Sequence, residues 1–149
     1  MKKLVSIFLL LAGLALESFG QFQVGQVTVT ASTLAANLHV PWELVWGPDN
    51  FIWMAERNGR ISRVDPATGQ VTPLITVTEV QQSGESGMLG LALHPGFSQN
   101  PYVFVVYTYS KNGQLTEKLV RFTYTGTTLT SPQVLLDDIP AATLHVGSR

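Results

Sequence analysis

The chain contains no cysteine, so disulfides and thiolate chemistry are absent from it. Zinc and iron–sulfur sites built on thiolates are therefore excluded, and so is a fold held together by disulfide bonds. Charged residues make up only 13% of the 149 residues, and the formal net charge is −1. This near balance gives no basis for binding nucleic acid, and we expect the fold to rest on a hydrophobic core.

An apolar run stands at the start of the chain, where Leu4–Leu16 follows the basic residues Lys2 and Lys3. The run is shorter than the about 20 residues that span a bilayer, and the small residues Ser18 and Gly20 follow it. We predict that residues 1–20 are a secretory signal peptide, with an uncleaved membrane anchor as the alternative. The protein is then expected to be secreted or periplasmic, with no membrane association after signal cleavage.

Beyond Gly20 the sequence shows no convincing helical periodicity and reads as strands and turns. Residues 21–37, with "QVTVTAS", are predicted to form an N-terminal lead-in strand. Residues 41–77 then give short strands separated by the turns "PDN", "RNG" and "PATGQ". The same rhythm recurs in "MLGLALHP", "YVFVVYTYS", "KLVRFTYTG" and "QVLLDD". The sequence therefore predicts an all-β chain with a repeated four-stranded antiparallel unit.

Such repeats are typical of β-propellers, in which roughly 4–8 blades of about 40–50 residues each close into a ring. The chain has room for two to three blades, so an open stack would leave the edge and apolar face of a blade uncovered. We therefore expect a partial propeller that belongs to a longer protein. A complete small β-sandwich without an active site is the alternative interpretation.

Two of the three histidines and a pair of acids have simple structural interpretations. His39, in "NLHVPW", is expected to be partly buried and to pack near Trp42, and His94, before a proline, is expected to stabilise a turn. Asp137 and Asp138 lack the ordered spacing of a calcium loop and are expected at a solvated strand end.

A run of arginines at a spacing of three also has a simple interpretation. Arg57, Arg60 and Arg63 fall across one turn of the first meander. We expect them to be exposed charges beside the acids of the same meander.

Two stretches could carry chemistry. In "ATLHVGSR", His145 is followed closely by glycine, and an imidazole can act as a base near neutral pH. In "QQSGESGMLG", Glu85 lies among three glycines, which allow a tight loop to bring a carboxylate to a confined place. Taken alone, the second stretch is better interpreted as a solvated glycine-rich turn, and it lacks the lysine of a phosphate-binding loop.

Several motifs in order carry a family resemblance: "PWELVWGPDNFIWMAERNGRISRVDPATGQV", "GESGMLGLALHPGF", "NPYVFVVYTYS", "LVRFTY" and "LHVGSR". Together they resemble the N-terminal part of the glucose/sorbosone dehydrogenase family, whose members include soluble sugar dehydrogenases that depend on pyrroloquinoline quinone (PQQ). The match runs over residues 38–149. It implies a six-bladed propeller, of which this chain is an N-terminal fragment.

The resemblance also implies a cofactor and two site residues. PQQ and calcium are expected, with most of their ligands beyond Arg149, so no cofactor-binding or metal-binding residue is assigned within the chain. His145 falls on the family's catalytic base, and Glu85 falls where the glucose enzymes carry a glutamine that binds the sugar. Leu144 replaces an aspartate of the glucose enzymes, so the sequence does not fix the sugar.

The resemblance implies oxidation of an aldose sugar, or a related alcohol, by His-assisted hydride transfer to PQQ. The electrons would pass to a further acceptor, and the fragment alone is expected to be inactive. A non-catalytic secreted β-propeller used for binding is the alternative, because one fold hosts many functions.

Overall fold

The computed structural model describes residues 20–148, and in this range the chain forms ten strands and no helix. The predicted signal peptide lies outside the described residues apart from Gly20. No helix long and apolar enough to cross a membrane occurs in the part of the chain that the structure describes.

A short hairpin begins the described chain and belongs to a separate unit that ends at Thr33. It consists of β1 (Gly20–Val24) and β2 (Val27–Ala31), which pair antiparallel. Gly25 turns the chain with a φ of 62°, a conformation that glycine adopts without steric cost. The region predicted as one lead-in strand, residues 21–37, contains β2 and most of β1, so it forms a hairpin and not a single strand.

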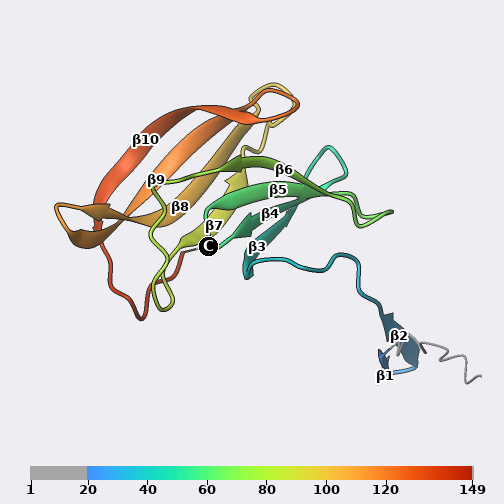
Figure 1. Ribbon diagram of the computed structural model, residues 1–149. Coiled ribbons are helices and arrows are strands. Elements are labelled where there is room, and N and C mark those ends of the chain that lie inside the picture. Colours follow the sequence, from blue (N-terminus) through green and yellow to red (C-terminus); the bar gives the residue numbers. More distant parts are fainter. Residues whose placement is uncertain (1–19, 149) are drawn as a thin grey trace, which may run out of the picture. The chain divides into compact units, whose positions relative to one another are not determined.

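The first four-stranded sheet is an antiparallel meander in which the spatial order of the strands follows the sequence (Figure 1). Its strands are β3 (Pro41–Trp46), β4 (Ile52–Glu56), β5 (Arg60–Val64) and β6 (Val71–Thr76). The turn between β4 and β5 needs a glycine, because Gly59 has a φ of 95° and a Cβ there would lie 2.6 Å from the carbonyl oxygen of Val77.

The second sheet repeats this pattern with longer strands. It consists of β7 (Met88–Leu93), β8 (Tyr102–Lys111), β9 (Gln114–Tyr124) and β10 (Leu129–Pro140), each antiparallel to its neighbour. Strands thus pair with their sequence neighbours within each sheet and none crosses between sheets. The predicted all-β chain with two four-stranded propeller blades is confirmed.

The two sheets pack on each other, with β3 and β4 lying against β7 (Figure 1). Trp53 of β4 is fully buried, and its ring meets Phe97 and Tyr124 edge-on at centroid distances of 5.4 and 5.0 Å. Aromatic pairs in this geometry stabilise a core beyond their buried area alone. This core fixes the position of one blade relative to the other, and so the position of the loops between them.

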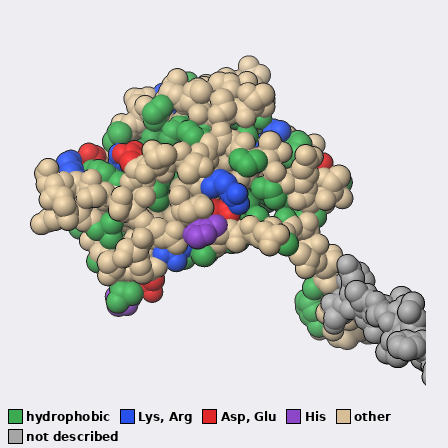
Figure 2. All heavy atoms as spheres, viewed as in Figure 1, with side chains coloured by type: hydrophobic (Ala, Val, Ile, Leu, Met, Phe, Trp, Pro, Cys, Tyr) green, Lys and Arg blue, Asp and Glu red, His purple; other side chains and the backbone are tan. Residues whose placement is uncertain are grey.

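A second set of apolar side chains stays outside this core. Trp42, Leu44 and Trp46 alternate along β3 and are exposed, which places them on one face of the strand. Figure 2 shows hydrophobic side chains reaching the surface among polar ones. The exposed face of β3 is therefore available for packing against a further layer.

Candidate functional site

The glycine-rich loop at residues 81–87 is held in shape by the buried side chain of Ser86. The Ser86 hydroxyl accepts a hydrogen bond from the amide of Ser83 at 2.9 Å and donates to the carbonyl of Ser83 at 2.7 Å. These bonds close the loop on itself, so a segment with little hydrophobic content still has a defined conformation.

The second blade anchors the base of this loop through Thr108 of β8. The Thr108 hydroxyl accepts from the amide of Gly87 at 2.9 Å and donates to the carbonyl of Gln81 at 2.6 Å. Thr108 is fully buried, and its bond with Gly87 is shielded from water. The loop therefore starts and ends on one side chain of the second blade.

The first blade holds the same loop through Arg57, which follows β4. Its guanidinium donates from Nε and Nη2 to the carbonyl of Ser86 at 3.2 and 2.7 Å, and also from Nη2 to the carbonyl of Gly84. The expectation of an exposed Arg57 is therefore wrong, since the side chain is partly buried where it binds the carbonyls of the loop. Sequence spacing could not show this contact, since donor and acceptors lie far apart along the chain.

The segment after β10 docks on the glycine-rich loop. The amide of Glu85 donates to the carbonyl of Thr143 at 2.8 Å, and the amide of His145 donates to Oε2 of Glu85 at 2.6 Å. His145 has a φ of 57°, a left-handed conformation that is uncommon for a residue with a side chain. The structure thus brings together the two predicted site residues, which lie 60 positions apart in the sequence.

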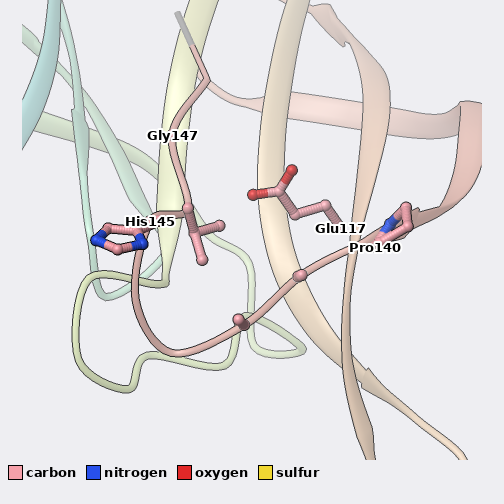
Figure 3. A pocket seen from close by; sticks show the side chains of 7 residues that line it. Glu117, Pro140, His145 and Gly147 are labelled. Atoms are coloured by element: carbon pink, nitrogen blue, oxygen red, sulfur yellow. The ribbon is translucent and has the colours of Figure 1, made fainter.

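The side chain of His145 is exposed, and its imidazole has no hydrogen-bond partner among the described residues. It projects from a loop that, with Glu117, borders a cavity of about 390 Å³. In Figure 3 the carboxylate of Glu117 points towards this loop, and the imidazole of His145 points away from Glu117. The imidazole is therefore open to solvent.

Glu117 is a residue of this cavity that the sequence did not single out. Its side chain is buried, its Oε1 has no hydrogen-bond partner, and burial raises the pKa of the carboxyl. A glutamate in a half-buried strand is a weak indication of a functional site, because the alternation of side chains along a strand does not show which loop will cover the glutamate.

The structure shows no contact of the other two histidines with Glu85 or His145 among the described residues. His39 is exposed, not partly buried as expected, and its Nε2 lies 3.1 Å from Oε1 of Gln82. The turn role of His94 is confirmed, because its Nδ1 accepts from the amide of Gly96 at 3.0 Å.

Arg60 and Arg63 are also partly buried, so the expectation of exposed charges is wrong for these two arginines as well. Arg60 pairs with the fully buried Glu56, and Arg63 pairs with Asp49 at 2.9 Å. Both pairs join residues of the first blade, as expected. They stabilise that blade and do not reach the loop of Glu85.

The paired acids lie at the far end of β10 and are exposed, as the sequence predicted. The Tyr109 hydroxyl donates to Asp137 and, with the amide of Asp138 and the ammonium of Lys111, lowers the pKa of Asp137 to about 2. Lys111 pairs with Asp138 as well, at 2.6 Å. These contacts describe a structural ion pair at a sheet edge.

Between residues 20 and 148 the structure holds no group of three or more His, Cys, Asp or Glu side chains that could bind a metal ion.

Two sequential four-stranded blades, with a glycine-rich loop and a histidine-bearing loop meeting at one end, define a β-propeller protein with a candidate site on its rim. The profile of the family described as glucose/sorbosone dehydrogenase matches residues 38–149. The chain belongs to this family.

Individual relatives agree with this assignment. The chain is 38% identical over 128 residues to quinoprotein glucose dehydrogenase B of Acinetobacter calcoaceticus, covering 78% of this chain and 27% of that protein. The PQQ-bound aldose sugar dehydrogenase of Streptomyces coelicolor superposes with a TM-score of 0.71 at 32% identity, over 79% of this chain and 36% of that one. An oxidoreductase of Thermus thermophilus, described as a glucose dehydrogenase, gives 0.67 at 39% identity, over 74% and 33%. The chain thus spans about a third or less of these relatives.

Proposed function

We propose that the full-length protein is a quinoprotein dehydrogenase that oxidises an aldose sugar or a related alcohol. The observation that carries this proposal is the contact between Glu85 and His145, two residues that the family resemblance assigns to sugar binding and to catalysis. The names of its relatives support PQQ as the cofactor and a sugar as the substrate. Calcium and an external electron acceptor are further parts of the proposal.

His145 is the base in this proposal. Its imidazole takes the proton of the anomeric hydroxyl as the hydride leaves the same carbon, which avoids a high-energy cationic intermediate. PQQ, when bound, supplies the hydride acceptor. The exposed and unpartnered imidazole supports this role, because nothing in the described chain competes for its nitrogens.

Glu85 is the second residue that we assign to the substrate. Its side chain is exposed, and one carboxylate oxygen, Oε2, is bound to the amide of His145. The other oxygen is left to accept a hydrogen bond from a sugar hydroxyl. Leu144 is 59% exposed and offers no hydrogen bond beside the base, which favours a broad range of aldoses over strict recognition of glucose.

The location of the protein is also a proposal. The basic start and the apolar run of residues 1–20 support export, to the periplasm or the medium. N-terminal sequencing of the secreted protein should begin near Gln21, and a chain that keeps Met1 would contradict this.

The proposal is tested with the full-length protein loaded with PQQ and calcium. We expect reduction of an artificial dye with at least one of a panel of aldoses, and a loss in kcat of about 10²- to 10⁴-fold for His145→Ala. A loaded protein that reduces no dye with any aldose would contradict the function. If PQQ also fails to raise the thermal stability, the binding propeller becomes the better interpretation, since a bound cofactor stabilises a protein by mass action.

A further inference from the structure

We propose that Arg57 is a positioning residue for His145, acting from the first blade through the glycine-rich loop and Glu85. The proposal deepens the function proposed above and rests on it for the catalytic consequence. The contacts themselves join three parts of the chain that the family resemblance does not connect: the end of β4, residues 81–87 and residues 143–145.

The first link joins the guanidinium to the loop. Arg57 reaches two carbonyls of the loop, those of Gly84 and Ser86, and these flank Glu85 on both sides. A planar guanidinium with donors on adjacent nitrogens fixes the direction of both carbonyls together, which a single point charge does not. The backbone on either side of Glu85 is thereby fixed relative to the first blade.

The second link joins the loop to the segment that carries the base. Glu85 binds this segment twice, through its own amide to Thr143 at 2.8 Å and through its carboxylate to the amide of His145 at 2.6 Å. The backbones of the loop and the segment lie close together at Gly84. A Cβ on this residue would lie 2.3 Å from the carbonyl oxygen of Thr143. Loop and segment therefore meet backbone to backbone.

The segment has little else to hold it. The two bonds to Glu85 are the hydrogen bonds that the structure shows for residues 141–148, and only Val146 among these residues is buried. His145 also has the left-handed φ of 57°, which persists only where the surroundings hold it. The direction of the imidazole thus depends on the loop. Thr108 holds the two ends of the loop, and Arg57 holds the carbonyls on either side of Glu85.

The experiment uses the full-length protein and two readouts. Hydrogen–deuterium exchange of the peptide that spans Thr143–Val146 reports the hold on the segment without any activity. In Arg57→Ala we expect this exchange to rise about tenfold, and kcat to fall about 10- to 100-fold with KM within about threefold, since misplacing a catalytic group lowers the rate more than binding. Arg57→Lys should lie between this variant and the wild type.

Arg63→Ala is the matched control. Arg63 is also a partly buried arginine of the first blade, and it binds Asp49 and lies over Phe51, 4.0 Å from the ring centroid. Its loss should lower stability without faster exchange at Thr143–Val146 and without a change in the kcat of the folded fraction. Equal effects of the two alanine variants on exchange and on kcat would overturn the proposal.

A double variant tests whether Arg57 and Glu85 act in one chain of contacts. Glu85→Ala should speed the exchange of the segment as Arg57→Ala does, and the double variant should exceed the larger single effect by less than about twofold. Additive effects would overturn the proposal. If the loaded wild-type protein oxidises no aldose, the proposed function fails, and the exchange data alone decide whether Arg57 holds the segment.

Discussion

Glu117 combines burial with a charge that lacks a partner, so its surroundings oppose ionisation. Burial alone raises the pKa of this carboxyl, and Oε1 accepts no hydrogen bond. A raised pKa in the folded state means that folding is favoured most below the unfolded value of 4.5, and that this contribution is lost as the pH rises through the folded pKa. At neutral pH the burial of the Glu117 carboxyl therefore destabilises the fold.

We predict that Glu117→Gln stabilises the full-length protein at pH 7 by about 1 kcal/mol, because a neutral amide costs less to bury than a carboxylate. The difference should shrink as the pH is lowered from 7 to 4, because the pKa of Glu117 is raised and the protonated carboxyl is as neutral as the amide. Urea denaturation at the two pH values checks this. A variant no more stable than the wild type at pH 7 would contradict the burial argument.

At the scale of elements, the two loops of the site depend on a glycine where they touch. Gly84 has a φ of 57° and lies against Thr143, whereas Gly113, in the hairpin between β8 and β9, has a φ of 79° and open space around it. The two residues share the backbone conformation and differ in the close approach. Substituting each glycine by alanine therefore distinguishes the effect of backbone strain at a positive φ from the effect of the contact between the loops.

Gly84→Ala should lower dye reduction by the full-length protein at least tenfold, because the added methyl group pushes the His145 segment away. Gly113→Ala should cost a similar backbone strain of about 1 kcal/mol and leave kcat within about twofold. Steady-state kinetics with thermal melts on both variants give the comparison. Equal losses of kcat would show that the contact between loops is unimportant.

At the scale of the whole molecule, the exposed face of β3 is the feature that governs solution behaviour. Leu44 and Trp46 are 58% and 60% exposed on one face of a strand, next to Trp42. Apolar residues grouped in this way favour association when nothing covers them. Residues 20–149 expressed alone are therefore expected to self-associate.

The double substitution Leu44→Ser and Trp46→Ser should shift this shorter protein towards monomer in sedimentation velocity. Leu34→Ser is the control, because Leu34 is also exposed but lies outside β3. A shorter protein that is already monomeric at high concentration, or that responds equally to both changes, would contradict the role of this face.

Strand positions followed from the sequence because their causes are local. The apolar run "FIWMAE" and turn residues such as Asn58 and Gly59 act within a few positions, and the blade that contains them forms as predicted. Residues 21–37 were predicted as one lead-in strand, and the hairpin of β1 and β2 was not foreseen, because it forms only when the two strands pair across Gly25. Arg57 was misjudged because its partners, the carbonyls of Gly84 and Ser86, lie far from it in the sequence.

The sequence by itself determined the all-β class, the repeat of four strands, the family and the identity of His145 and Glu85 as candidates. Only the tertiary structure decided that Glu85 binds the amide of His145, that Arg57 holds the loop between them, and that Glu117 is buried beside the same segment. Periodicity and turn chemistry act over a few residues, whereas these contacts exist only once the core around Trp53 has packed one blade on the other.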